Sequence, residues 1–219
     1  MMIEFPKAFF VTGTDTGIGK TFVSAVLLKA TGGSYWKPIQ SGTLEQTDTE
    51  WVKEMTRLPS DHFFDETYKL TQPLSPHASA KIDGTRIDMN AFKLPACDFA
   101  PLIVEGAGGL MVPLNEDAFI LDLIEQLNLP VVVVARSTLG TINHTTLTLN
   151  ALRARKLSIL GVVLNGEPNE GNKQAIEEYG KAPVIACVPP MGAPTPETID
   201  KTVDYFKSGT RAAATVKAR

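Results

Sequence analysis

The segment VTGTDTGIGKT, residues 11–21, ends in the Gly-Lys-Thr of a phosphate-binding loop. In the usual pattern, G-x-x-x-x-G-K-[ST], the first glycine would stand at position 14, but that residue is Thr14 and the glycine is Gly13. An apolar helix-like run begins at Lys20, so backbone N–H groups and the positive helix end can face an anion. Lys20 adds a positive charge, and the Thr21 hydroxyl is suited to ligating magnesium. We therefore favour a phosphate loop over a glycine-rich turn without function.

Two carboxylates are candidates to complete a magnesium site with the threonine hydroxyl. Glu105 ends an apolar strand in LIVEGAGG, and the glycines that follow allow a ligand to approach closely. We favour a functional role for Glu105 over that of a satisfied residue at a sheet edge. Asp48, in QTDTEW, starts a predicted helix, where aspartate is also a common N-cap. Both interpretations of Asp48 stay open, with metal ligation favoured.

The segment WKPIQSG, residues 36–42, places a lysine directly before a proline. A residue before proline is held extended, and Ser41-Gly42 favours a turn, so Lys37 can be presented rigidly. On these residues alone, the segment is more simply interpreted as a loop with a solvated lysine.

The elements that must position these residues are indicated by short apolar runs that alternate with helix-like segments. The alternation predicts a single wound α/β fold, with a mostly parallel central sheet and helices on both faces. Strands are predicted at 7–12, 100–105, 130–135, 158–165 and 182–188. Helices are predicted at 20–30, 119–128, 143–156 and 172–180. The polar, proline-containing stretch 38–98 is interpreted as an excursion with short helices, one of them at 47–55, rather than as a separate domain.

The chain has 219 residues, of which 43% are hydrophobic and 21% charged, and its formal net charge is -3. We expect one domain over residues 1–208 and a flexible tail at 209–219. The sequence has no basic cluster and no long apolar segment, so we expect neither nucleic acid nor a membrane as a partner. Cys97 and Cys187 match no zinc spacing, which favours buried structural thiols and a cytoplasmic location.

Five motifs follow one another along the chain between residues 11 and 148. They are VTGTDTGIGKT, KPIQSG at 37–42, LSPH at 74–77, VEGAGG at 104–109 and LGTINHTTLT at 139–148. This set resembles the dethiobiotin synthetase family, which has a P-loop NTPase-like fold. The displaced glycine is that family's form of the loop.

The resemblance implies an ATP- and Mg²⁺-dependent cyclo-ligase of biotin biosynthesis. Its substrates would be 7,8-diaminononanoate, CO2 or bicarbonate, and ATP. A substrate amine would capture CO2 as a carbamate, the γ-phosphoryl group would form a carbamic-phosphoric anhydride, and the second amine would close dethiobiotin, leaving ADP and phosphate. The chain shows no convincing Ser/His/Asp or Cys/His nucleophile arrangement, which agrees with a route without a covalent enzyme intermediate.

The resemblance also implies residue roles. Lys37 and Lys20 would neutralise the carbamate and the transferring phosphoryl group, because two anions must meet. Thr16 and Ser41 would hydrogen-bond the substrate or phosphate. The implied ligands of Mg²⁺ are Thr21, Asp48 and Glu105. The residues implied to bind ATP are Gly13, Thr14, Asp15, Thr16, Gly17, Ile18, Gly19, Lys20, Thr21, Asn165, Pro189 and Met191, the last three at the base.

In the resembled family, the helix that begins in LGTINH takes the distant carboxylate of the substrate from the neighbouring subunit. The resemblance therefore implies a homodimer with active sites at the subunit interface. The residues at that place are Gly140, Thr141, Ile142 and Asn143, and Lys37 and Ser41 complete the implied substrate site. A second interpretation, in which Thr141 and Asn143 cap the helix, stays open because capping and anion binding use the same geometry. For His77 and His144 we favour structural hydrogen bonding over chemistry.

Three alternatives belong to other classes of protein. ATP-driven partitioning switches of the same superfamily carry a lysine five places before the loop lysine, whereas this chain has Asp15. Amidotransferase ligases need a further glutaminase domain, for which the chain has no room. A third alternative, a kinase of a small metabolite, stays open in the case that KPIQSG is not the family motif. One departure from some family members is Gly17, which stands where they carry an acidic residue.

Overall fold

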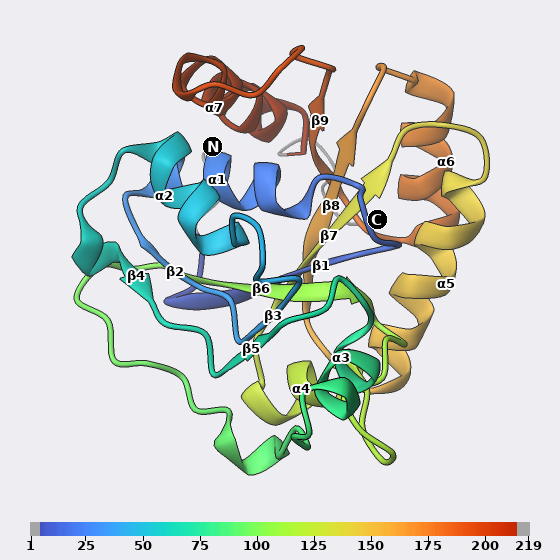
Figure 1. The fold of residues 1–219 in the computed structure, drawn as a ribbon. Coiled ribbons are helices and arrows are strands. Elements are labelled where there is room, and N and C mark those ends of the chain that lie inside the picture. The colour runs from blue at the N-terminus through green and yellow to red at the C-terminus, as the bar shows by residue number, and fades with distance from the viewer. Residues whose placement is uncertain (1–4, 214–219) are drawn as a thin grey trace.

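The structure, a computed structural model, describes residues 5–213, with side chains described as far as Phe206. Its main sheet consists of β1 (Ala8–Gly13), β2 (Ser34–Trp36), β4 (Phe63–Phe64), β6 (Leu102–Gly109), β7 (Val131–Arg136), β8 (Ile159–Asn165) and β9 (Val184–Val188). The strand order is β4-β2-β6-β1-β7-β8-β9, and every pair is parallel (Figure 1). The chain leaves β1 toward one edge and later builds the other, so the carboxyl end of β1 lies at a topological switch point, where ligands of such sheets bind.

The sheet is buried on both faces because its strands are apolar at successive positions. Phe9 and Val11 of β1 belong to one hydrophobic cluster, whereas Phe10 between them belongs to the other. This is the two-residue period of an extended strand with a helix layer on each side. A shift of β1 by one residue would exchange the side chains on its two faces, so the register of β1 in the sheet is fixed.

Two helix layers cover the sheet. One contains α1 (Lys20–Thr31), α2 (Asp48–Thr56) and α7 (Pro196–Ala213), and the other contains α4 (Ile120–Leu127), α5 (Thr141–Ala154) and α6 (Glu170–Gly180) (Figure 1). The predicted α/β fold, with a parallel sheet and helices on both faces, is confirmed. No described helix combines the length and the apolar character needed to span a membrane.

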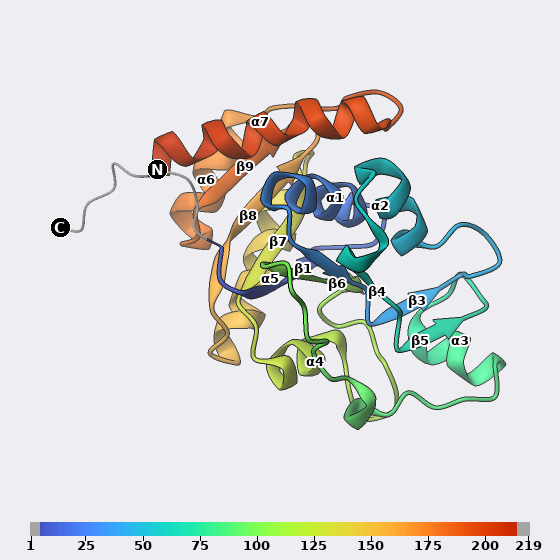
Figure 2. The same ribbon diagram turned by 90° about the vertical axis from the view of Figure 1, so that its left-hand side faces the viewer.

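The excursion between β2 and β6 forms a small structure of its own on the main core. It contains a two-stranded parallel sheet of β3 (Ile39–Ser41) and β5 (Tyr68–Leu70), the helix α3 (Pro76–Ile82), and the 3₁₀ helices η1 (Ser60–His62) and η2 (Met89–Ala91). Figure 2 shows β3, β5 and α3 grouped at one side of the molecule. Ile39, Leu70 and Phe92 join the same hydrophobic cluster as β6, so the excursion is packed on the sheet rather than separate from it.

The five predicted strands and the helices at 20–30, 47–55, 119–128, 143–156 and 172–180 are all present, with ends shifted by a few residues. β6 runs to Gly109 instead of ending at Glu105, because the glycines continue the extended pairing as far as Gly13 after an irregularity in register. The helix α7, which the sequence analysis did not predict, extends to Ala213. It therefore enters the expected tail, whose remaining residues 214–219 lie outside the described part.

Candidate active site

The predicted phosphate loop connects β1 to α1 at the carboxyl edge of the sheet. Gly19 is the N-cap of α1 with φ of 89°, and Gly17 has φ of 69°, a region that favours glycine. No side chain caps α1, so its first N–H groups are not taken up by a capping side chain and can donate to a bound anion. The Lys20 ammonium donates to the Asp15 carbonyl oxygen at 2.9 Å. Burial lowers the pKa of Lys20 to about 8, against the opposing attraction of Glu105.

Asp15 organises the loop through its side chain. Its carboxylate accepts from the Thr16 backbone N–H at 2.7 Å and from Arg136, at the end of β7, at 2.7 Å. The residue that replaces the lysine of partitioning switches is therefore an acid that ties the loop to a neighbouring strand. The sequence analysis did not single out Arg136, although its place at a strand end beside the loop was a usable signal.

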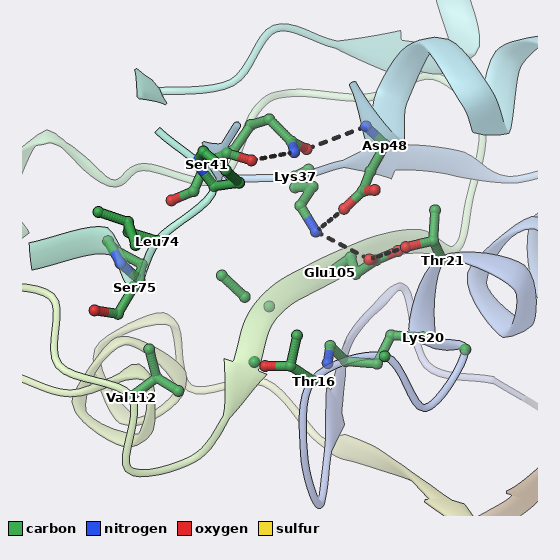
Figure 3. A pocket seen from close by; sticks show the side chains of 18 residues that line it. Thr16, Lys20, Thr21, Lys37, Ser41, Asp48, Leu74, Ser75, Glu105 and Val112 are labelled. Carbon is green, nitrogen blue, oxygen red and sulfur yellow. Dashed lines mark hydrogen bonds and ion pairs between the residues drawn. The ribbon is translucent and has the colours of Figure 1, made fainter. Parts of the chain in front are cut away.

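Glu105 and Lys37 form the centre of a charged cluster beside the loop (Figure 3). Glu105 Oε1 accepts from Thr21 Oγ1 at 2.9 Å and from Lys37 Nζ at 3.0 Å. Lys37 Nζ also forms an ion pair with Asp48. The structure thus brings together the three predicted metal ligands and the predicted catalytic lysine, from β6, α1, α2 and the end of β2.

Lys37 is a buried ammonium rather than a solvated one, with only 4% of the residue exposed. Burial alone would lower its pKa, but the carboxylates of Glu105 and Asp48 outweigh that effect and raise the pKa of Lys37 above its usual range. The interpretation of Lys37 as an exposed loop lysine is therefore wrong. Lys37 therefore stays protonated, and its ammonium lies between two acids.

Asp48 is not the N-cap of α2. Thr47 takes that position, and its hydroxyl accepts from the Glu50 N–H while the Glu50 carboxylate accepts from the Thr47 N–H. The Asp48 N–H donates to Gln40 Oε1 at 3.1 Å, which leaves the Asp48 carboxylate free to face Lys37. Gln40, from β3, is a positioning contact that the sequence analysis missed.

A second missed residue is Tyr35, in β2. Its hydroxyl donates to Glu105 Oε2 at 3.0 Å, and the residue is fully buried. Burial, and then the charge of Glu105, raises the pKa of Tyr35 well above its usual value, so the hydroxyl stays protonated. The spacing Tyr35-x-Lys37 in an extended segment was a signal that both side chains lie on one face.

A cavity of about 780 Å³ opens over this cluster. Thr16, Lys20, Lys37 and Ser41 all line it, and the Ser41 hydroxyl is buried with no hydrogen-bond partner. Figure 3 shows Leu74, Ser75 and Val112 on the opposite side from Asp48 and Thr21. The other residues that line the cavity are Gly17, Gly19, Thr21, Gln40, Asp48, Pro73, Leu74, Ser75, Pro76, Glu105, Gly106, Ala107, Gly108 and Val112. The cavity is therefore lined by two lysines, two carboxylates and several hydroxyl groups, with apolar surface from Leu74 and Val112 on the side away from Asp48 and Thr21.

A second hollow, of about 260 Å³, gathers the residues predicted to bind a base. Asn165, Pro189 and Met191 line it together with Phe22 of α1. The Asn165 amide donates to the Ile18 carbonyl oxygen at 2.9 Å, and a Cβ on Gly19 would meet that amide at 2.2 Å. The glycine of the phosphate loop thus makes room for the amide, which retains its oxygen and a second N–H for a ligand.

The start of α5 has Gly140 as its N-cap, with φ of 92° and no side-chain cap. The Thr141 side chain is buried and pairs with Thr145 at 3.3 Å, and neither Thr141 nor Asn143 caps the helix. The capping interpretation is therefore wrong. Within the described residues, 140–143 do not line the 780 Å³ cavity.

The remaining candidates have modest roles. His77 Nδ1 lies 3.1 Å from Ser75 Oγ, and His144 is exposed on α5. Cys97 and Cys187 are free thiols and only partly buried, which corrects the expectation of buried thiols. Cys97 lies in the loop before β6, and Cys187 is the penultimate residue of β9. Among residues 5–213, no group of three or more His, Cys, Asp or Glu side chains could hold a metal ion. A cation site made of the predicted residues would combine the two carboxylates of Asp48 and Glu105 with the hydroxyl of Thr21.

A family model described as an AAA domain matches residues 7–198. The ATP-dependent dethiobiotin synthetase BioD of Paramagnetospirillum magneticum is 51% identical over 193 residues, which cover 88% of this chain and 93% of that protein. The chain belongs to the dethiobiotin synthetase family. The family predicted from the five motifs, with its ATP-dependent enzyme class, is confirmed.

Further relatives differ in length. BioD of Bradyrhizobium diazoefficiens is 44% identical over 201 residues, covering 92% of this chain and 94% of that protein. The biotin biosynthesis bifunctional protein BioCD of Bordetella avium is 50% identical over 196 residues, which are 89% of this chain but 42% of that protein. The match to the bifunctional protein therefore concerns less than half of its length.

Solved structures share the fold at low sequence identity. The MinC:MinD cell division protein complex of Aquifex aeolicus aligns with a TM-score of 0.58 and 12% identity, over 98% of each chain. A plasmid partition protein from Borrelia burgdorferi aligns with a TM-score of 0.52 and 9% identity, over 94% of this chain and 99% of that one. These likenesses show the fold of the family and nothing of its chemistry.

Proposed function

We propose that this chain carries out the ATP-dependent carboxylation of 7,8-diaminononanoate and its ring closure to dethiobiotin, with release of ADP and phosphate. The observation that carries the proposal is the buried Lys37 ammonium, which lines a large cavity beside the phosphate loop. Such a cation is what the meeting of a carbamate and a γ-phosphate requires. Family membership supplies the substrate class.

The proposed metal is Mg²⁺, held by Thr21, Asp48 and Glu105. The donor set fits, because all three are oxygen ligands, and Mg²⁺ binds through one or two carboxylates with phosphate and water as its other ligands. When bound, the ion would neutralise charge on the phosphates. In this structure Lys37 contacts the carboxylates of both Asp48 and Glu105. A divalent cation that binds these oxygens would therefore free the Lys37 ammonium for anions in the cavity.

Different side chains are proposed to bind the phosphates of ATP and the carbamate. The β- and γ-phosphates bind to the N–H groups of the loop, to Lys20 and to Thr16. The phosphates give the Lys20 ammonium an anionic partner, whereas in this structure it donates to a carbonyl oxygen. Lys37 and the unpartnered Ser41 hydroxyl hold the carbamate oxygens. The carbamate oxygen attacks the γ-phosphorus and ADP leaves. The second amine then attacks the carbonyl carbon, the C–O bond to phosphate breaks, and the cyclic urea forms.

The base end of ATP is proposed to lie in the 260 Å³ hollow. Asn165 offers an amide to the base edge, and Pro189 and Met191 offer apolar contact. The rest of the nucleotide would follow the loop residues Gly13, Thr14, Asp15, Gly17, Ile18 and Gly19 toward the cavity.

The substrate's distant carboxylate is proposed to bind at Gly140–Asn143 of a second subunit in a homodimer. Two observations support this. The start of α5 lacks a side-chain cap, and Leu139, Ile142 and Leu147 around it are exposed together with Met111. Leu147 and Met111 line a further hollow of about 310 Å³ beside the loop residues Thr14–Thr16.

We also propose a cytoplasmic location, with small molecules and a second copy of the chain as the partners.

The decisive experiment is an assay of ADP release with all four combinations of diamine and bicarbonate. Release is expected only when both are present, together with transfer of ¹⁴C from bicarbonate into an acid-stable product. ADP release without the diamine would contradict the proposal, and release with diamine but without CO2 or bicarbonate would indicate a kinase. Sedimentation at the assay concentration should give a dimer, and a fully active monomer would overturn the shared site.

A further inference from the structure

The two carboxylate oxygens of Glu105 have different surroundings. Oε1 faces Thr21 and Lys37, at 2.9 and 3.0 Å, whereas Oε2 accepts the Tyr35 hydroxyl at 3.0 Å. The Glu105 side chain has no exposed surface, so water cannot take over the place of a missing donor. One oxygen is therefore turned toward the proposed metal and the other is anchored in the protein.

The anchor follows from the geometry of β2. Tyr35 lies in β2, and Lys37 directly follows that strand and precedes Pro38, which favours extended backbone, so the two side chains leave the chain on the same face. β2 pairs with β6 in parallel, and Tyr35 lies opposite Ile103, two residues before Glu105. The Tyr35 ring packs against Phe63 with centroids 6.3 Å apart, which fixes the direction of its hydroxyl.

We propose that Tyr35 is a positioning residue for the metal site, because its hydroxyl holds Glu105 Oε2 and thereby presents Oε1 to the cation. The inference rests on the proposed Mg²⁺ site and deepens it. The terminal torsion of a glutamate is broad and roughly two-fold, so an unanchored carboxylate turns readily. Groups that hydrogen-bond a ligating carboxylate tune metal affinity even though they never touch the ion.

The test is Tyr35→Phe, which removes one oxygen atom and leaves the ring in place. Mn²⁺ serves as the probe, and its free concentration is measured by electron paramagnetic resonance in the presence of the full-length protein and a non-hydrolysable ATP analogue. The variant is expected to raise the dissociation constant for Mn²⁺ about tenfold. Binding of the same analogue in EDTA is expected to stay unchanged, because Tyr35 does not line the cavity.

Tyr68→Phe is the matched control. The Tyr68 hydroxyl accepts from the Asp88 N–H at 2.8 Å, remote from the metal ligands in the hydrogen-bond network, and its loss should leave Mn²⁺ affinity unchanged. Equal Mn²⁺ affinity in Tyr35→Phe and in the unmodified protein would overturn the role of Tyr35 alone. A parallel loss of analogue binding in EDTA, or a failure to fold, would overturn it in favour of a general structural role.

The assay also separates this inference from the proposed reaction. It needs no diamine, so a protein that binds Mn²⁺ through Glu105 but makes no dethiobiotin would retain the Tyr35 role and lose the proposed function. An unmodified protein that binds no Mn²⁺ with the analogue would overturn both the metal site and its positioning residue.

Discussion

The phosphate end and the base end of the proposed nucleotide site are built by different means. At the phosphate end, buried charged and hydroxyl side chains from β2, β6, α1 and α2 hold one another through ion pairs and hydrogen bonds. At the base end, three prolines and a methionine after β9 line the hollow together with one amide at the end of β8, and no charged side chain lines it. Charge has to be placed accurately, whereas a flat ring needs only contact surface and one polar edge.

The difference has an energetic basis. A buried charge whose partner is removed stays unpaired at a high cost, so the phosphate end changes as a unit. The base end consists of few contacts, and loss of one leaves the others in place. Variants at the two ends should therefore affect different kinetic constants.

The largest effect is expected for Lys37→Ala. Because the proposed role of Lys37 is to stabilise charge that develops in the transition state, kcat should fall by about 10²–10³-fold while the KM for ATP changes little. Steady-state kinetics of dethiobiotin formation, with nucleotide binding measured separately, checks this. The control is Lys69→Ala, an exposed lysine of β5 paired with Glu66 at 3.2 Å, which should behave as the unmodified protein.

The same variant tests the competition between Lys37 and the cation. Without the ammonium, Asp48 and Glu105 are left uncompensated, so Mn²⁺ should bind the nucleotide-free variant more tightly than the unmodified protein. Unchanged kcat would remove Lys37 from the chemistry, and weaker Mn²⁺ binding would show that Lys37 supports the site rather than occupying it.

A smaller effect of another kind is expected for Asn165→Ala. The KM for ATP should rise about tenfold, because the base edge and the Ile18 carbonyl lose a hydrogen-bond partner, while kcat should stay nearly constant. Kinetics with ATP and with other nucleoside triphosphates measures both constants. Asn172→Ala is a suitable control, since its amide supports the Ser137 carbonyl outside the hollow. A fall in kcat as large as that of Lys37→Ala would show that the two ends are not separable.

The parts of the candidate site that the sequence could indicate are contiguous motifs. The loop from Gly13 to Thr21 and the apolar strand that contains Glu105 each carry a local pattern that needs no tertiary information. The residues around Lys37 alone favoured a solvated lysine, and its expected role came from the family resemblance. Asp15 also separated the chain from partitioning switches, whereas the fold alone resembles a cell division protein and a plasmid partition protein.

The parts that were missed are contacts between distant segments. Tyr35 and Gln40 act on residues 70 and 8 positions away, and nothing in their local sequence names those partners. β2 and β4 are too short to show a period. In α7, Ile199, Val203 and Phe206 recur at helical spacing, but the polar residues between them lower the apolar signal.

The smallest effect is expected for Glu50→Gln, in the helix start that presents Asp48. Hydrogen bonds from the Thr47 backbone N–H and then its hydroxyl lower the pKa of Glu50. A carboxyl whose folded pKa is lowered stabilises the fold above its unfolded pKa, about 4.3, and loses that contribution as pH falls through the folded value. The variant should therefore unfold at a slightly lower temperature than the unmodified protein at pH 7, and the difference should shrink as the pH falls below the unfolded pKa and through the lowered folded pKa of Glu50. Thermal unfolding across this range measures it, with Glu54→Gln on the same helix as the control. Because Gln40 still holds the Asp48 N–H, Mn²⁺ affinity should hardly change, and a large loss would mean that the helix cap, not the β3 contact, positions the ligand.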